Sequence, residues 1–344
     1  MRSEPGLIYK DLNPSYLNPI RLPKFPISGS ASQPLRRSAG TPPRELAGRD
    51  DLIEPSAIAL DRIRAGRAAR SFILYGLRGV GKTVLLNRIR MDAEARGFFA
   101  ARMEVPEERS LPALLVPNLR ALLLRLDRGE RVRAAARKAL RVLAGFARAL
   151  KFKYQDMDVS LEYEPEPGAA DSGDLETDLT ALLASVGTAA AERGTAVVLF
   201  IDELQYIKEA QLAALISALH NASQSQLPLT LVAAGLPQLV AQTERAKSYT
   251  ERLFEFASVD RLDEPAARAA LCVPAEKEQV RFEEGAISEI LRQTLGYPYF
   301  LQEWGKHSWD LADASPIGRA DADRATLQAL AELDAGFFAS VSTG

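Results

Sequence analysis

The chain has 344 residues, of which 47% are hydrophobic and 26% are charged. This length fits one large domain or two modest ones, and the composition excludes wholesale disorder, collagen-like repeats and coiled-coil arrays. The 43 Lys and Arg side chains nearly balance the 45 Asp and Glu side chains. The resulting net charge of −2 predicts neither a nonspecific nucleic-acid binder nor an acidic tail protein.

Cysteine content and apolar runs bear on disulfides, metal sites and membranes. Cys272 is the only cysteine, so it forms no internal disulfide, and one cysteine with two histidines does not make an ordinary zinc site. No apolar run approaches the roughly 18 residues that a membrane span needs. The first residues, MRSEPGLIYKDLNPSYL, lack a signal-peptide core. We therefore expect a cytoplasmic protein with no membrane partner.

The first 44 residues hold 8 of the 20 prolines and the run SGSAS, so regular structure is not expected there. We predict that residues 1–44 form a flexible, proline-rich arm. Two interpretations stay open for residues 16–27, where apolar side chains are frequent. They are a partner-binding segment, or part of a tail that lies loosely on its own domain.

Beyond Arg70, short β-rich runs alternate with helix-like stretches. The five runs typical of strands are 71–76, 97–105, 195–202, 227–235 and 253–260. Nearly continuous apolar strands separated by helices are typical of a parallel sheet covered on both faces. The sequence therefore predicts the α/β class.

About 90 residues separate the second and third runs, more than one crossover helix requires, which predicts an insertion at about 106–180. Residues 120–153 contain eleven Lys and Arg but two acidic residues, whereas residues 154–180 contain nine Asp and Glu and no Lys or Arg. Helical spacing in the basic stretch separates an apolar face from an arginine face. The first comprises Leu140, Leu143, Ala147 and Leu150, and the second Arg137, Arg141 and Arg148. Alternation over 151–164 predicts a hairpin.

Two interpretations of this basic helix stay open. One is a solvated helix face whose positive charge the following acidic stretch balances. The other is a contact surface for DNA, RNA or an acidic protein partner over 120–153. Nearby aromatic residues are limited to Phe146, Phe152 and Tyr154, too few to argue for a base-stacking platform.

The clearest motif follows the first predicted strand. That strand runs directly into GLRGVGKT at 76–83, which fits the phosphate-loop pattern GxxxxGK[ST] and precedes a helical run. Its glycines let backbone amides wrap around phosphate oxygens, and the following helix adds its positive end. The predicted nucleotide-binding residues here are Gly76, Gly79, Val80, Gly81, Lys82, Thr83 and Val84.

Four side chains carry the predicted chemistry. Lys82 supplies charge at the β- and γ-phosphates, which makes it a catalytic candidate, and Thr83 offers a hydroxyl ligand to Mg²⁺. The apolar run VVLFIDE at 197–203 ends in two carboxylates. Asp202 is expected to hold Mg²⁺ through its water shell, while Glu203 is placed to orient or deprotonate the attacking water.

Four segments together resemble a P-loop ATPase of the AAA+ superfamily, close to archaeal-type ATPases, Orc/Cdc6-like initiators and STAND signalling ATPases. They are ELAGRDDL (45–52), GLRGVGKT, FIDELQ (200–205) and TLGYPYFLQ (294–302). The resemblance covers about residues 45–310 and leaves the insertion unexplained. It implies a three-layer αβα P-loop domain over 45–260 around a parallel five-stranded sheet, a helical lid over 261–344, and ATP as the nucleotide.

The resemblance also suggests contacts with the base. Gly48 and Arg49 match a box that borders adenine in the family, although a loop that begins a helix explains them equally well. Pro298 matches the Gly-x-Pro element of the lid and would pack against the base. The alternative is a proline that starts a lid helix without touching ligand.

Arg252 lies where the family places an arginine that completes the site of a neighbouring subunit. Such a residue would stabilise the transferring phosphoryl group and implies a homo-oligomer. The alternative is a surface ion pair with Glu251 or Glu255.

Two departures from the family favour slow turnover that acts as a switch. Residues 233–235 are Ala-Ala-Gly where many members have a polar sensor, which leaves Gln238 or Asn221 for that role. The lid also lacks an arginine beside Pro298. Relatives with this lid commonly continue into a winged helix of about 70 to 80 residues, so we expect a truncated form.

Three functions compete at this point. The first is an Mg²⁺-dependent ATPase that hydrolyses ATP slowly to ADP and phosphate and couples nucleotide state to the lid. The second is a nucleotide-gated, DNA-associated regulator with little hydrolysis. The third is a STAND-like scaffold that oligomerises when ATP is bound. A kinase is least expected, because no acceptor site is recognisable beside the phosphate loop.

Overall fold

The computed structural model describes residues 46–127, 133–151, 153–154, 156–157 and 163–341. The predicted arm at 1–44 lies outside these residues, as does much of the predicted hairpin. The described residues between 151 and 164 lie in turns, bends and irregular structure, and none of them belongs to a strand.

The chain divides into two compact units. We call the first the sheet unit, which comprises Asp50–Leu77 and Leu85–Val259. The second, the lid unit, comprises, among the described residues, 46–49, Arg78–Val84 and 260–341. Most of the phosphate loop therefore clusters with residues that lie far from it in the sequence.

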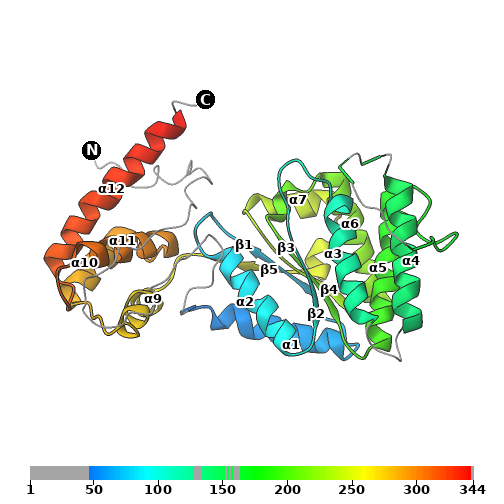
Figure 1. The fold of residues 1–344 in the computed structure, drawn as a ribbon, viewed down its shortest axis with the longest axis horizontal. Helices are drawn as coiled ribbons and strands as arrows, with labels where there is room; N and C mark the ends of the chain where they lie inside the picture. Colours follow the sequence, from blue (N-terminus) through cyan, green and yellow to red (C-terminus); the bar gives the residue numbers. More distant parts are fainter. Residues whose placement is uncertain (1–45, 128–132, 152, 155, 158–162, 342–344) are drawn as a thin grey trace. The chain divides into compact units, whose positions relative to one another are not determined.

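Five strands form the sheet of the sheet unit (Figure 1). They are β1 (Ser71–Tyr75), β2 (Phe99–Glu104), β3 (Val197–Asp202), β4 (Leu229–Gly235) and β5 (Phe254–Ser258). Their order is β2-β3-β4-β1-β5, and every neighbouring pair is parallel. β3 and β4 are interior strands and are buried along their whole length, as their continuous apolar sequences require. The α/β class and all five predicted strands are confirmed.

Helices cover both faces of this sheet (Figure 1). One face carries α1 (Asp50–Arg64) and α2 (Lys82–Ala95), and the other carries α3 (Leu111–Leu126), α5 (Leu175–Glu192) and α6 (Glu209–Gln224). Right-handed crossovers explain this division, because the connection from β1 to β2 runs across the sheet in the opposite direction to the later connections. Shorter elements complete the unit: η3 (Leu204–Tyr206), α7 (Gln238–Ala246) and α8 (Thr250–Leu253).

The insertion between β2 and β3 contains the predicted basic helix, α4 (Arg133–Leu150). α4 packs on α3 and α5, and its predicted apolar face is buried: Leu140, Leu143 and Leu150 are fully inaccessible. Side-chain hydroxyl and carboxylate caps begin the flanking helices, with Ser110 accepting from Ala113 N in α3 and Asp174 accepting from Thr177 N in α5.

Acidic residues form ion pairs with two arginines on the arginine face of α4. The Arg141 Nε atom lies 2.8 Å from Glu166 Oε2, and the Arg137 Nε atom lies 3.4 Å from Asp127 Oδ1. Glu166 belongs to the acidic stretch, so this pair supports the interpretation of a solvated, charge-balanced face. Both arginine side chains remain about half exposed, so each pair contributes little to stability.

The described part of the lid unit contains the helices α9 (Glu264–Glu276), α10 (Glu284–Thr294), α11 (Pro298–Leu311) and α12 (Arg319–Val341). Ile287 and Ile290 of α10 share a buried core with Phe300 and Trp304 of α11. Gly296, between α10 and α11, has a φ of 74°, and a Cβ there would lie 2.3 Å from Leu262 O, so only glycine fits this turn. No helix in the described ranges is both long enough and apolar enough to cross a bilayer.

Candidate functional site

The phosphate loop leaves β1 at the edge of the sheet where the parallel strands end. Gly76 N donates to Gly235 O at 3.3 Å, which joins the start of the loop to the end of β4. Gly79 and Gly81 have φ values of 81° and 93°, a region that side-chain-bearing residues rarely adopt. α2 begins at Lys82, so its first amides have no partners within the helix. The loop therefore has the backbone of an anion cradle.

The electrostatics of the α2 start also favour an anion. Lys82 is only 6% exposed, and the first turn of α2 contains no acidic residue. Acidic side chains are usually favoured at the positive end of a helix dipole, so a lysine at this position is unfavourable on its own. A bound phosphate would compensate both charges. Val80 is buried beside this lysine in the loop, while Thr83 and Val84 are half-buried in the first turn of α2.

The two predicted carboxylates lie at the same edge of the sheet. β4 lies between β1 and β3 in the sheet. The strand that ends before Gly76 and the strand that ends at Asp202 are therefore roughly 10 Å apart. Asp202 is buried as the last residue of β3, and its Oδ1 accepts from Glu203 N at 3.0 Å. Glu203 adopts a left-handed conformation with φ 53° and ψ 40°. This turn changes the direction of the chain directly after the strand.

Gln205 ties the Glu203 carboxylate to β4, a role that the sequence did not reveal. Its Nε2 donates to Glu203 Oε2 at 2.5 Å, and its Oε1 accepts from Leu236 N at 3.0 Å. A Cβ on Gly235 would lie 2.7 Å from Gln205 Oε1, so the small residue at the end of β4 admits this amide. The available signal was a polar residue two positions after the acidic pair.

Neither residue proposed as a replacement sensor takes this place. Asn221 is exposed in the last turn of α6, which leads to the amino end of β4, so the expectation for Asn221 is wrong. Gln238 is exposed as the first residue of α7. A polar side chain that meets the end of β4 is Gln205, from the β3 side.

Within the lid unit, Arg49 joins the phosphate loop to the start of the lid. Its Nη2 donates to Val80 O at 3.1 Å and to Asp260 O at 2.5 Å. Gly48 has a φ of 65°, and a Cβ there would lie 2.4 Å from Ala266 Cβ. α1 begins at Asp50, so the interpretation of a loop that begins a helix is confirmed, while contact with adenine stays a prediction.

Two tyrosines beside Pro298 contact the phosphate loop within the same unit. Tyr299 N donates to Gly79 O at 3.2 Å, and the Tyr297 hydroxyl donates to Arg78 O. Pro298 itself is the first residue of α11, which confirms the helix-start interpretation and leaves its contact with a base as a prediction. The sequence motif contained both tyrosines, but nothing in their spacing indicated this contact.

Arg252 lies at the other edge of the sheet. Arg252 precedes β5, which is parallel to β1, so it lies at the amino ends of the strands. Gly76 and Asp202 lie at the carboxyl ends of β1 and β3. Arg252 is exposed and makes no ion pair with any residue that the structure describes, so the pair with Glu251 or Glu255 is not found. It lines a cavity of about 600 Å³. Other lining residues are Arg62, Arg70, Glu54, Ile58 and Glu255.

Comparison with known families decides between the P-loop classes. Residues 45–232, more than half of the chain, match the AAA ATPase domain. The chain belongs to the AAA ATPase family. This membership makes ATP binding and hydrolysis the general activity of the chain. No protein of curated function matches the sequence.

Solved structures resemble this AAA ATPase at low identity. A Walker-type ATPase of Pyrococcus abyssi has a TM-score of 0.56 at 14% identity, over 88% of this chain and 77% of that one. That likeness shows the shared fold. Orc1 of Aeropyrum pernix, solved in complex with DNA, has a TM-score of 0.48 at 15% identity, over 83% and 66%. The Thermotoga maritima RuvB Holliday junction branch migration motor has a TM-score of 0.46 at 17% identity, over 81% and 68%.

Proposed function

We propose that this AAA ATPase binds Mg-ATP at the phosphate loop and hydrolyses it slowly to ADP and phosphate, and that nucleotide state changes the contacts of the lid. One observation carries the proposal. An anion cradle that leads into the start of α2 follows β1, and a buried aspartate and a restrained glutamate lie at the end of β3, at the same edge of the sheet. These are the components that phosphoryl transfer to water requires.

The loop supplies most of the proposed contacts with phosphate. Backbone amides of the glycines and of the first turn of α2 would bind the phosphate oxygens, and Lys82 would bind the β- and γ-phosphates as a point charge. Gly81 has open space where a Cβ would lie, so the loop can approach a ligand on that side. Gly48, Arg49 and Pro298 are the proposed neighbours of the base.

Two oxygen donors of the sequence motifs fit Mg²⁺. Thr83 offers a hydroxyl at the start of α2, and Asp202 offers a buried carboxylate at the end of β3. Hard oxygen ligands together with retained waters suit this ion. Bound Mg²⁺ would neutralise charge on the phosphate oxygens.

Glu203 is the proposed general base. The attacking water gives a proton to its carboxylate, a bond forms from the water oxygen to the γ-phosphorus, and the bond to the bridging oxygen of ADP breaks. The short hydrogen bond from Gln205 holds the Glu203 carboxylate in one orientation. This restraint supports the proposal of slow turnover.

The lid contacts support the proposed switch. Tyr297 and Tyr299 contact backbone atoms of Arg78 and Gly79, and Arg49 spans from Val80 to Asp260. A nucleotide that moves the loop would therefore alter these lid contacts directly. Such differential contact with two states is what couples a ligand to a conformational change.

The position of Arg252 favours a second candidate, ATP-dependent homo-oligomerisation as the output. An exposed arginine at the edge opposite Gly76 and Asp202, with no ion pair among the residues that the structure describes, would meet a phosphate of another subunit rather than one of its own. The exposed arginines of α4 supply the proposed surface for DNA or an acidic partner, although the Arg137–Asp127 and Arg141–Glu166 pairs occupy two of them.

Phosphate release from Mg-ATP tests the ATPase proposal. We expect turnover by the unaltered chain, loss of at least tenfold in kcat with retained ATP binding in Glu203→Gln, and loss of ATP binding in Lys82→Ala. Glu209→Gln, the same charge change at an exposed position of α6, should leave kcat unchanged. Tight ATP binding without turnover in the unaltered chain, or equal kcat in Glu203→Gln, would contradict it.

The same assay with duplex DNA at two salt concentrations separates the partner hypotheses. Stimulation by DNA that weakens steeply with salt would assign the α4 face to phosphate contacts. Light scattering with and without ATP tests assembly as the output. Insensitivity to DNA together with ATP-dependent growth in mass would favour the oligomerising scaffold.

A further inference from the structure

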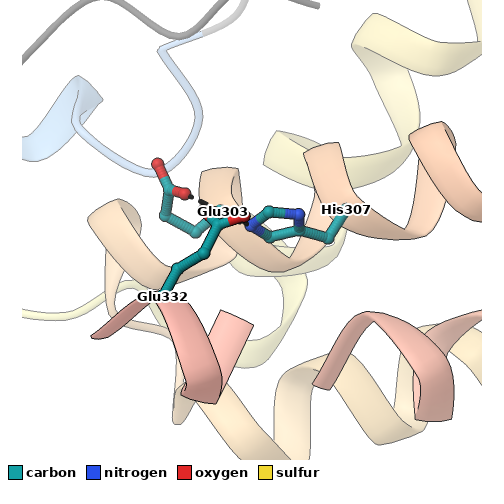
Figure 2. A group of neighbouring side chains, drawn as sticks. All are labelled: Glu303, His307 and Glu332. Atoms are coloured by element: carbon teal, nitrogen blue, oxygen red, sulfur yellow. Dashed lines mark ion pairs between the residues drawn. The ribbon is translucent and has the colours of Figure 1, made fainter. Parts of the chain in front are cut away.

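Three side chains from two helices of the lid unit converge on one another. Glu303 and His307 are four residues apart on α11, and Glu332 approaches them from α12 (Figure 2). The His307 Nε2 atom lies 3.4 Å from Glu332 Oε2 and 3.7 Å from Glu303 Oε2. One ligand atom from each of the three side chains lies within 4.8 Å of the other two.

The buried histidine at the centre of this cluster lacks hydrogen bonds. His307 is 1% exposed, and neither of its ring nitrogens has a hydrogen-bond partner among the described residues. Two of its neighbours on α11 are satisfied: Trp304 Nε1 donates to Thr326 Oγ1 at 3.0 Å, and Ser308 Oγ donates to Trp304 O at 2.8 Å. A buried polar group without a partner is costly, so this imidazole points to a missing ligand.

The spacing of the three ligand atoms suits one small cation. Two atoms bonded to a tetrahedral Zn²⁺ at about 2.0 to 2.2 Å lie about 3.3 to 3.6 Å apart. The two distances from His307 Nε2 match this range within a small side-chain adjustment. An imidazole nitrogen with two carboxylates also fits a divalent transition metal better than Mg²⁺, which favours oxygen ligands alone.

We propose that Glu303, His307 and Glu332 form a binding site for a divalent transition-metal ion, with Zn²⁺ as the ion that the ligand spacing fits. In the sequence, the scarcity of cysteine and histidine argued against an ordinary zinc site. This cluster differs from such a site because two of its three ligands are carboxylates, and they come from helices that the sequence alone does not pair. Exposure rises from 14% for the Glu303 side chain to 54% for that of Glu332, so the cluster opens to solvent on the α12 side. The ion can enter there, and a water can complete its coordination.

The bound metal would fasten α12 to α11. Glu332 lies near the end of the described side chains of α12. The Trp304–Thr326 hydrogen bond, which also joins α11 to α12, lies about two turns earlier on α12. An ion that binds only the folded lid stabilises it in proportion to the logarithm of metal concentration over Kd. This site is separate from the proposed Mg-ATP site and does not depend on it.

Zinc titration of the full chain, stripped with chelator and free of nucleotide, tests the site. We expect one Zn²⁺ per chain by calorimetry and a change in fluorescence, because both tryptophans, Trp304 and Trp309, lie on α11 beside His307. Glu332→Gln should weaken Zn²⁺ binding at least tenfold. Glu276→Gln, an equal charge change at an exposed position of α9, should leave the affinity unchanged.

Further variants keep the test decisive. Co²⁺ should give d–d absorption typical of a protein site in the unaltered chain, and Glu332→Gln should lose it. His307→Ala removes the nitrogen but also a buried ring, so its circular dichroism must first match that of the unaltered chain. Absence of Zn²⁺ binding, or equal affinity in the unaltered chain and Glu332→Gln, would overturn the proposal. A Lys82→Ala chain that binds Zn²⁺ normally would separate this result from any failure at the nucleotide site.

Discussion

At the residue scale, the most informative contact is the one between Gln205 and Glu203. Glu203 is held in a left-handed conformation that costs energy for a residue with a side chain, and Gln205 fixes its carboxylate against the end of β4. A general base at this position would therefore be held in one orientation. The local geometry therefore supports the proposal of slow hydrolysis.

Removing the amide of Gln205 should release this restraint. A hydrogen bond to a charged group contributes about 1.5 to 3 kcal/mol, and only part of this bond would have to break before the Glu203 carboxylate turns toward the attacking water. We expect Gln205→Met to raise kcat about three- to tenfold with little change in KM for ATP, measured by phosphate release. Gln224→Met, at an exposed position at the end of α6, should change neither. A lower kcat in Gln205→Met would show that Gln205 orients the base instead of restraining it.

At the element scale, the strands and α4 could be predicted, because their signals are local. The continuous apolar runs of β3 and β4 and the helical spacing of Leu140, Leu143 and Leu150 depend only on neighbours in the sequence. The phosphate loop and the acidic pair were also local patterns. Contacts between elements could not be predicted in this way, and they include the carboxylate cluster around His307.

Glu289 shows how two lid helices are joined by charge. It is buried on α10 and accepts hydrogen bonds from Arg292 at 2.6 and 2.8 Å and from Gln293 at 2.7 Å, while Arg319 of α12 lies 3.0 Å away. The bonds from Arg292, followed by Gln293 and the charge of Arg319, hold the pKa of Glu289 at about 2. A carboxylate with a depressed pKa stabilises the fold above its ordinary pKa near 4.5, and this contribution is lost as pH falls toward 2.

Glu289→Gln should therefore destabilise the lid in a pH-dependent way. We expect a loss of about 1 to 2 kcal/mol at pH 7, below the cost of a fully buried pair because the guanidinium groups are exposed. Both tryptophans lie on α11, so urea unfolding followed by tryptophan fluorescence reports on the lid unit. The difference from the unaltered chain should shrink as pH falls from about 5 toward 2. A difference that stays constant over this range would contradict the assignment, and Glu276→Gln should lie within about 0.5 kcal/mol of the unaltered chain at pH 7.

At the scale of the whole molecule, the division of the chain brings the phosphate loop together with residues distant in sequence. The Arg49–Asp260 bond spans 211 positions, and the Tyr297–Arg78 bond spans 219. No periodicity or motif spacing carries information over such separations, so the sequence could suggest a lid but not its tyrosine contacts. The same limit applies to Arg252, whose edge of the sheet becomes clear only from the strand order.

Topology makes a sharp prediction for Arg252. Because it lies at the amino edge of the strands, it cannot complete the site of its own chain, whose components follow the carboxyl edge. We expect Arg252→Ala to lower kcat at least tenfold under conditions where the chain assembles, with ATP binding retained. Mixing Arg252→Ala with Glu203→Gln should restore part of the activity, because one chain supplies the base and its neighbour supplies the arginine. Arg245→Ala, at an exposed position of α7, is the matched control and should retain full activity. Mixtures no more active than the two variants alone would exclude action between subunits and leave Arg252 as a residue of the 600 Å³ cavity that it lines.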